Sequence, residues 1–276
     1  MAQITAADVS KLRKVTGAGM MDCKKALEES DGNFDKAIEI IRKKGQAIAN
    51  KRADREAAEG VVLAKITGDE KYGALIVLNS ETDFVAKNEN FIKFAGSILD
   101  LALENKPSDL NALLQLKLNG ITVADAVTEQ TGIIGEKIEL SMFDFISAEQ
   151  VIAYIHPGNK LSTLAGFNKK VTDIQVVKDV AMQIAAMNPI AVDKDDVSKE
   201  MIDKEIEIGK EQAKREGKPE EMLEKIAMGK LNKFFKESTL LNQEFTKDNK
   251  ITIRQYLQNT DKDLTVTKFI RYSLNV

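Results

Sequence analysis

The sequence predicts an α+β fold, and three observations support this prediction. Apolar residues recur at helical spacing before Gly60, whereas strand-like apolar runs follow it. The order strand, strand, loop, helix then occurs twice, which indicates a duplicated α+β core. A Lys- and Glu-rich stretch interrupts the second copy and predicts an inserted antiparallel helical hairpin. We therefore expect three parts, namely residues 1–55, residues 56–147, and residues 148–276 with the insertion at about 190–237.

The N-terminal part is predicted to contain three short helices. Thr5 and Asp8 form a cap signature for a first helix that extends to about Val15. The segment TGAGM breaks this helix, MDCKKALEES forms a second, and DGN leads into a third, FDKAIEIIRKK. Three apolar residues share one face of the third helix: Phe34, Ile38 and Ile41. The polar, alanine-rich segment that follows is expected to be a helical or extended linker.

The first copy of the core begins with two predicted strands, VVLAKI and YGALIVLN, joined by a hairpin turn. A helix is expected from about Asn88, followed by shorter helices over 109–118 and 122–130. The apolar stripe of the first of these helices consists of Phe91, Phe94, Ile98 and Leu101. From Glu136 the apolar alternation predicts another strand. Its apolar face consists of Ile138, Leu140 and Met142.

The second copy is predicted to contain strands at VIAYIHP and STLAGFN, a helix from about Asp173 to Met187, and a final strand at TVTKFIRYSL. The inserted hairpin occupies about 195–237. Gly217 can end its first helix in a left-handed conformation, and Pro219 can open its second. The narrow apolar stripe and charged exterior are typical of a coiled coil, which suits packing against a second copy.

Composition narrows the class of protein. The 276 residues favour two or three compact units, and the 43% hydrophobic and 30% charged fractions are typical of a water-soluble globular protein. No apolar run is long enough to span a bilayer. The absence of secretory-signal features and the single cysteine fit a cytoplasmic, reducing location. A net charge of -3 argues against a protein that mainly binds nucleic acid.

The glycines of TGAGM invite comparison with a phosphate-binding loop. No strand precedes them and no Gly-Lys-Ser/Thr follows, so a tight turn between helices is the favoured interpretation. Such a turn presents Met20 and Met21 as adaptable apolar contacts. The segment therefore indicates a contact surface more than a nucleotide site.

Residues for bond chemistry are scarce. Cys23 lies beside two lysines, which can activate a thiol, but its place in a short helix favours burial. His156 is the only histidine and precedes a Pro-Gly turn. One cysteine and one histidine form neither a usual zinc site nor a recognisable nucleophilic constellation. We therefore expect no enzyme activity and no metal site.

Two further segments allow two interpretations each. The basic clusters RKK (42–44) and KRADR (51–55) suit either RNA contact or a solvated linker, and the lack of interleaved aromatic residues favours the linker. In NSETDFVAKN, Thr82 or Asp83 can cap a helix with Phe84 folded inward. Alternatively, a rigid loop holds Phe84 outward as an apolar wedge with carboxylates at its base.

The segments TGAGMMDCKKAL (16–27) and TDFVAKN (82–88), in this order and at this distance, resemble the bacterial translation elongation factor Ts family, and the resemblance extends through nearly the whole chain. It implies a ubiquitin-associated-like three-helix N-terminal domain and a coiled-coil hairpin that the family uses for dimer contacts. It also implies guanine nucleotide exchange on the GTPase elongation factor Tu during polypeptide elongation. This role requires no bond chemistry, cofactor, membrane or direct nucleic-acid contact.

The same resemblance implies which residues contact the partner. In TDFV, Asp83 and Phe84 form the wedge against the GTPase domain, flanked by Thr82 and Val85, and displace the magnesium ion so that GDP is released. The supporting contacts are Met20, Met21, Ile134, Gly135 and His156, the last with Tyr154 in YIHPG. Two departures from the family pattern are expected: the C-terminal helical module of some members is missing after Val276, and the loop after YIHPG diverges.

Two other classes of function remain as alternatives. A binding adaptor would use the three-helix part and leave the core as a scaffold. A hydrolase would use Cys23 or His156 and lose turnover when either is replaced. Phe84 distinguishes the adaptor from the exchange factor, because its replacement by Ala slows GDP release from the partner only if the protein acts as an exchange factor.

Overall fold

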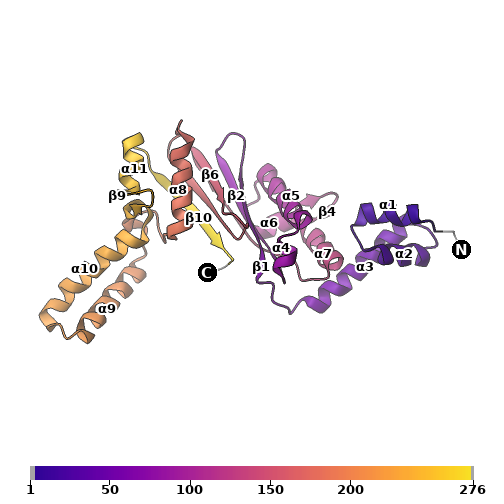
Figure 1. Ribbon diagram of the computed structural model, residues 1–276, viewed down its shortest axis with the longest axis horizontal. Helices are drawn as coiled ribbons and strands as arrows, with labels where there is room; N and C mark the ends of the chain where they lie inside the picture. Colours follow the sequence, from indigo (N-terminus) through magenta and orange to yellow (C-terminus); the bar gives the residue numbers. More distant parts are fainter. Residues whose placement is uncertain (1–3, 275–276) are drawn as a thin grey trace. The chain divides into compact units, whose positions relative to one another are not determined.

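The computed structural model describes residues 4–274, and its N-terminal part consists of three helices (Figure 1). Helix α1 (Ala6–Thr16) begins at a capping box formed by Thr5 and Asp8, as predicted. It ends at Gly17, whose φ of 69° is left-handed and therefore suits glycine. The second helix is α2 (Met20–Glu29) and the third is α3 (Phe34–Arg52).

These three helices enclose a small apolar core. Its buried members include Val9, Leu12, Cys23, Leu27 and Ala37. Cys23 is fully buried, which confirms the structural interpretation of this cysteine. Helix α3 has 19 residues and continues through the first half of the predicted linker, so this half is helical. A single long helix therefore extends from the N-terminal core towards the first strand.

The first sheet has three strands in the order β1-β2-β5: β1 (Glu59–Ile66), β2 (Tyr72–Ser80) and β5 (Glu139–Ser147). Every residue of the central strand β2 is buried. In β5 the predicted alternation is wrong at one position. Leu140 is buried, but Met142 is half-buried and Phe143 takes the next buried place. A spacing of three residues breaks the two-residue period of a regular strand face.

Six elements lie between β2 and β5 in the sequence. They are α4 (Asp83–Ala86), α5 (Glu89–Asn105), α6 (Leu110–Gln115), β3 (Lys117–Leu118), β4 (Ile121–Thr122) and α7 (Val123–Ile134). The hairpin of β3 and β4 replaces the end of the helix predicted over 109–118, because strands of two residues leave no periodic signal. Helix α7 is longer than predicted and ends at Gly135, with a left-handed φ of 79°.

The buried face of α5 differs in part from the predicted stripe. Phe91 and Ile98 are buried as predicted, whereas Phe94 and Leu101 are only half-buried. The remaining buried positions are Ala95, Leu99, Ala102 and Leu103. The buried residues still follow helical spacing, along a stripe that overlaps the predicted one only in part.

The second sheet repeats the order of the first. Its strands are β6 (Gln150–Ile155), β7 (Leu161–Phe167) and β10 (Val266–Ser273), with β7 in the centre and both neighbours antiparallel to it. Helix α8 (Ile174–Met187) follows β7, as α4 and α5 follow β2. Its inner side packs into a core that includes Phe167, Val177, Ile184 and Leu257. The predicted duplication of strand order is therefore present in the topology.

The insertion in the second half is a pair of adjacent helices, α9 (Lys199–Arg215) and α10 (Glu220–Ser238) (Figure 1). Gly217 has a left-handed φ of 72° and Pro219 precedes α10, as predicted for this turn. Gly209 of α9 lies against Ala227 of α10, so the two helices approach closely. Short helical turns flank the pair at Lys194–Asp196 and Leu240–Asn242.

The segment after the helical pair was not anticipated from the sequence. It contains β8 (Glu244–Phe245), β9 (Asp248–Thr252) and α11 (Ile253–Thr260). Strands β8 and β9 are too short to give a clear periodic pattern. Helix α11, by contrast, begins at a capping box formed by Thr252 and Gln255 and buries Ile253 and Leu257, a local signal that the prediction overlooked.

By their contacts the residues form two compact units. The first comprises the chain to Leu63 together with Ile76–Asp144, and the second comprises Ala64–Leu75 together with Phe145–Ser273. Strands β1, β2 and β5 contribute residues to both units. Among helices within 4–274, none combines the length and apolarity needed to cross a membrane.

Candidate functional site

Phe84 is the most exposed large apolar side chain of the described residues, with 83% of its surface accessible. It belongs to α4, a helix of four residues between β2 and α5. The interpretation in which Phe84 folds inward is therefore wrong. An aromatic ring in this position offers a large rigid area for contact with another protein.

The residue that starts α4 is held by an acidic side chain from a distant part of the chain. Thr82 is the N-cap, but its hydroxyl does not cap the helix. Instead, the hydroxyl donates to one carboxylate oxygen of Glu136 at 2.8 Å, and the Thr82 N–H donates to the other at 3.0 Å. Ser80 adds a hydrogen bond to the Thr82 carbonyl at 3.0 Å. The backbone just before Phe84 is thus fixed on several sides.

Glu81 forms the reciprocal contact. Its carboxylate accepts the Lys137 N–H at 2.6 Å and also pairs with Arg52 at 2.7 Å and Arg55 at 3.3 Å. Burial on its own raises the pKa of Glu81, but the hydrogen bonds from Lys137 and Arg52 and the two positive charges outweigh it, so the pKa is lowered. Glu81 is therefore held in its charged form. We call Glu81 and Glu136, with these partners, the carboxylate clamp.

An ion pair between the side chains of Asp83 and Lys87 spans the short helix α4. Lys87 donates to Asp83 at 2.5 Å, and this hydrogen bond raises the pKa of the Lys87 ammonium group. Asn88 then caps α5 by accepting the N–H of Asn90 at 2.8 Å. The charge of Asp83 is accordingly balanced within its own helical turn, beside the exposed ring of Phe84.

The end of α7 lies beside the same loop. Val85 and Ile134 line one shallow hollow together with Phe91, Gln130 and Ile133. Gly135 follows Ile134 as the left-handed C-cap, and Glu136 of the clamp comes next. The structure therefore brings the TDFV residues and the predicted supporting residues Ile134 and Gly135 into one place, although they are far apart in the sequence.

Helix α3 contacts α7 through two glycines. A Cβ atom added to Gly132 would lie 2.3 Å from the Cα of Gly45, so the two backbones touch and larger side chains do not fit. The Ile133 side chain of α7 also lies close to Gly17, the residue at which α1 ends. The α1–α2 turn thus lies next to the helix that ends at the clamp.

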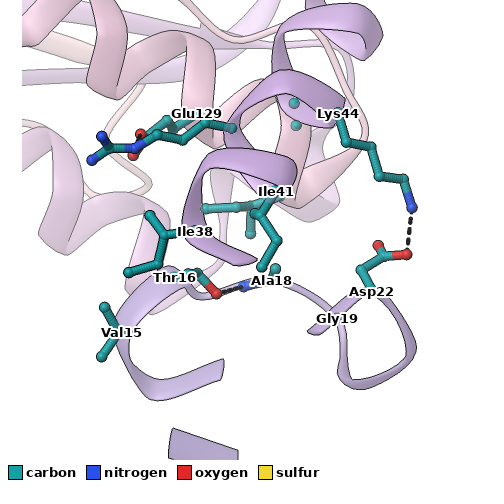
Figure 2. A pocket seen from close by; sticks show the side chains of 13 residues that line it. Val15, Thr16, Ala18, Gly19, Asp22, Ile38, Ile41, Lys44 and Glu129 are labelled. Atoms are coloured by element: carbon teal, nitrogen blue, oxygen red, sulfur yellow. Dashed lines mark hydrogen bonds and ion pairs between the residues drawn. The ribbon is translucent and has the colours of Figure 1, made fainter. Parts of the chain in front are cut away.

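A hollow of about 140 Å³ lies at this junction (Figure 2). Its apolar lining includes Val15, Ala18, Ile38, Ile41 and Ile133. Two ion pairs also border it, one between Arg42 and Glu129 at 2.7 Å and one between Lys44 and Asp22, which Figure 2 shows on the opposite side from Glu129. The hollow is an apolar surface framed by charge, with room for a single apolar side chain.

Met20 and Met21 occupy the first turn of α2, directly after Gly19, which lines this hollow. Both side chains are exposed. They belong to the same compact unit as Phe84. This exposure is compatible with their predicted role as apolar contacts.

Phe84 belongs to the first compact unit, whereas His156 and Tyr154 belong to the second. The Tyr154 hydroxyl and His156 Nδ1 form a hydrogen bond of 2.9 Å at an exposed position. Cys23 is fully buried and its sulfur contacts the Ala18 carbonyl at 3.7 Å. A buried thiol is poorly placed as a nucleophile, which weakens the hydrolase alternative.

The roles of the clamp residues were not predicted from the sequence. Glu81 and Glu136 were visible as carboxylates in NSETDF and IIGEK, but their pairing joins residues 54 to 56 positions apart. Arg52 and Arg55 belong to the basic cluster that was weighed as an RNA contact. Their ion pairs with Glu81 give these two arginines a structural role that neither interpretation of the cluster anticipated.

Comparison with known proteins agrees with the motifs. A family model described as elongation factor TS matches residues 81–276. Elongation factor Ts of Porphyromonas gingivalis is 53% identical over 273 residues, which cover 99% of this chain and 98% of that protein. Elongation factor Ts of Christiangramia forsetii is 52% identical over 275 residues (99% and 100%), and that of Amoebophilus asiaticus is 54% identical over 270 residues (97% and 98%). The chain therefore belongs to the elongation factor Ts family.

Proposed function

We propose that this protein is a guanine nucleotide exchange factor for elongation factor Tu and acts in the cytoplasm during polypeptide elongation. In this role it binds the GTPase domain of its partner and promotes release of GDP, so that GTP can bind. It makes and breaks no covalent bond. Membership of the elongation factor Ts family supports the general role, and the Phe84 loop supports the mechanism.

The proposal rests on the exposure of Phe84 in a loop whose backbone is held by hydrogen bonds. An apolar ring that is 83% accessible has little value for the stability of the isolated chain. Glu136 nevertheless fixes the backbone just before it by accepting both donors of Thr82, and a side-chain pair between Lys87 and Asp83 spans the short helix. A rigid exposed aromatic residue is typical of an anchor at a protein interface.

The proposed mechanism couples two binding equilibria. If the factor binds the nucleotide-free partner more tightly than the GDP-bound partner, it must weaken GDP binding by the same ratio. Insertion of Phe84, flanked by Thr82, Asp83 and Val85, shifts the partner's elements that hold its magnesium ion. The ion neutralises much of the diphosphate charge, so its displacement leaves GDP in a poorer electrostatic site.

Supporting contacts extend the proposed interface. Ile134 and Gly135 lie beside the loop, since Ile134 shares the hollow with Val85. Met20 and Met21 offer exposed apolar surface on α2. We assign His156 to the same partner on the resemblance of YIHPG alone.

We also propose how the parts of the chain serve this role. Residues 1–55 form a ubiquitin-associated-like domain, 56–147 and 148–276 form the two core subdomains, and the insertion at about 190–237 is a coiled-coil arm. Exposed apolar side chains on this arm support contact with a second copy: Met201, Ile208, Met222 and Met228. Such an antiparallel helix pair with an unpartnered apolar side suits a homodimer.

Stopped-flow release of a fluorescent GDP from elongation factor Tu, with magnesium present, tests the proposal. The wild type should accelerate release. Phe84→Ala should reduce this acceleration by at least about tenfold, the size expected when an interface anchor is truncated. Ile174→Ala is a matched control, because Ile174 is another exposed apolar residue at the start of a helix that follows a central strand.

Two outcomes would contradict the proposal in different ways. If the wild type binds the partner but does not accelerate release, the protein acts as an adaptor. If Phe84→Ala and Ile174→Ala both behave as the wild type, exchange does not depend on the wedge. A second measurement at low magnesium sharpens the result, since the advantage of the wild type should shrink when the ion is already absent.

A further inference from the structure

We propose that Glu81 and Glu136 are positioning residues that hold Phe84 outward before the partner arrives. The proposal rests on the proposed exchange function and adds to it two residues that do not themselves form the wedge.

A helix of four residues does not maintain its own geometry. Nucleation of a helix is unfavourable, and α4 is too short to recover that cost by propagation. The usual remedy is an N-cap side chain that accepts a backbone N–H of the first turn, but Thr82 makes no such bond. The direction of Phe84 must therefore be set by contacts from outside the helix.

The clamp supplies these contacts in a reciprocal form. Glu136 accepts both donors of Thr82, at 2.8 and 3.0 Å, and Glu81 accepts the backbone N–H of Lys137 at 2.6 Å. Each segment thus places a carboxylate on the backbone of the other. Hydrogen bonds to a charged acceptor are among the stronger ones in proteins. Movement of the loop would break all three bonds together.

A largely buried carboxylate needs positive charge close by to remain ionised. Arg52 and Arg55 supply that charge at Glu81, whose side chain is only 14% exposed. Arg52 is the last residue of α3, so the clamp is tied to the long helix from the N-terminal core. The arrangement is consistent with a rigid support and not with a loop that closes over a ligand.

The other half of the clamp is anchored in α7. The Ile138 N–H donates to the hydroxyl of Thr131 in α7 at 3.1 Å, in a buried position. Gly132, the next residue, is in backbone contact with Gly45 of α3. Glu136 therefore extends from a segment that is fixed at both ends, which makes it a suitable support for Thr82.

The test combines exchange kinetics with amide hydrogen exchange on the full chain. The main variants are Glu136→Ala and Glu136→Gln, which keeps one acceptor oxygen. Lys169→Met is the matched control, because Lys169 makes the corresponding ion pairs, with Asp261 and Asp263, after the central strand of the second sheet. Thermal unfolding shows whether each variant is folded.

We expect Glu136→Ala to lower the maximal rate of GDP release roughly tenfold to hundredfold, because misplacement of a positioned group by about 1 Å has effects of this size. Amides of residues 82–88 should exchange at least about tenfold faster, while those of β2 stay protected. Glu136→Gln should restore part of both effects. Lys169→Met should leave both measurements at the wild-type level.

Three results would overturn the proposal. One is unchanged hydrogen exchange at 82–88 in Glu136→Ala, and another is faster exchange there with a normal rate of GDP release. The third is equal loss of rate in Lys169→Met, which would indicate a general loss of stability. If the wild type fails to accelerate GDP release, the proposed function fails instead, and hydrogen exchange still decides whether Glu136 holds the loop. If Glu136→Ala does not fold, Glu136→Gln and Glu81→Gln carry the same test.

Discussion

The two sheets share one strand order, but the connections that leave their central strands differ. After β2, residues 81–88 present Phe84 to solvent. After β7, residues 168–173 bury Val171 and expose no large apolar side chain in that stretch. The connection after the central strand thus exposes an aromatic ring in the first repeat and buries an apolar side chain in the second.

The second connection is nevertheless anchored in a similar way. Asn168 donates to the Asp263 carbonyl at 2.7 Å and accepts the Thr265 N–H at 2.9 Å. Lys169 pairs with Asp261 at 2.9 Å. These partners directly precede β10, just as Glu136 and Lys137 directly precede β5. In both units the connection is fixed to the chain segment that enters the third strand.

The anchoring of a connection and the side chain that it exposes are therefore separate properties. The topology brings each connection next to the entry of the third strand, so polar contacts between them are a property of the repeat. What differs is the side chain that each connection carries and the charge that surrounds it. Only the first combines an exposed aromatic ring with support from Arg52, the last residue of α3, and the nearby Arg55. Three predictions test this difference.

The largest effect is expected for Gly132→Ala, which should separate α3 from α7. The added methyl group would overlap the backbone at Gly45, and backbone cannot yield as a flexible side chain can. We expect a loss of about 3 kcal/mol in the free energy of unfolding, near the upper end for overpacking. Urea denaturation checks this value.

Gly96→Ala in α5 is the control for this change. No atom lies within 4 Å of the position of its added Cβ. The substitution should stabilise the protein by about 0.4–1 kcal/mol, since Ala restricts the unfolded chain more than Gly does. Equal effects of the two substitutions would show that the contact between α3 and α7 is not tight.

A medium effect is expected when the two connections are truncated in parallel. Val171→Ala removes two buried methyl groups and should lower the free energy of unfolding by about 1–2 kcal/mol. Phe84→Ala removes a much larger side chain, yet should change stability by less than about 0.5 kcal/mol because the ring is exposed. Thermal and urea unfolding measure both. If Phe84→Ala lowered the free energy of unfolding more than Val171→Ala, Phe84 would contribute to packing and the contrast between the two connections would be wrong.

The smallest effect is a pH dependence that comes from Glu81. Its pKa in the folded protein lies below the ordinary value of 4.5. Its contribution to stability is therefore complete above pH 4.5 and is lost as the pH falls through the folded-state pKa, because the unfolded chain binds the proton first. Compared with Glu81→Gln, the wild type should lose stability more steeply below pH 4.5.

Urea unfolding of both proteins over a pH series measures this difference. The comparison cancels the other carboxylates whose pKa is lowered, such as Asp179 and Asp193. Lys169→Met provides the corresponding series for the second connection, where the hydrogen bond from Lys169 lowers the pKa of Asp261. If the stability advantage of the wild type over Glu81→Gln, measured as free energy of unfolding, increased as the pH falls, the pKa of Glu81 would be raised in the folded protein.

The sequence by itself determined much of the local structure. The capping box at Thr5, the break at Gly17 and the turn at Gly217 depend on residues within a few positions of each other. Helical spacing and strand-like runs likewise revealed the three N-terminal helices, the repeated strand order and the helical arm. The two motifs around TGAGM and TDFV were specific enough to indicate the family.

Only the tertiary structure decided how Phe84 is directed and what holds it there. The local sequence allowed the ring to fold inward or outward, since Thr82 and Asp83 are both able to cap a helix. The choice depends on Glu136, which lies 54 residues away and reaches Thr82 because the strands adjoin in the sheet. The contact between Gly45 of α3 and Gly132 of α7 likewise joins residues that are far apart in the sequence. Caps and periodicity act over a few residues, whereas these contacts exist only once the chain has folded.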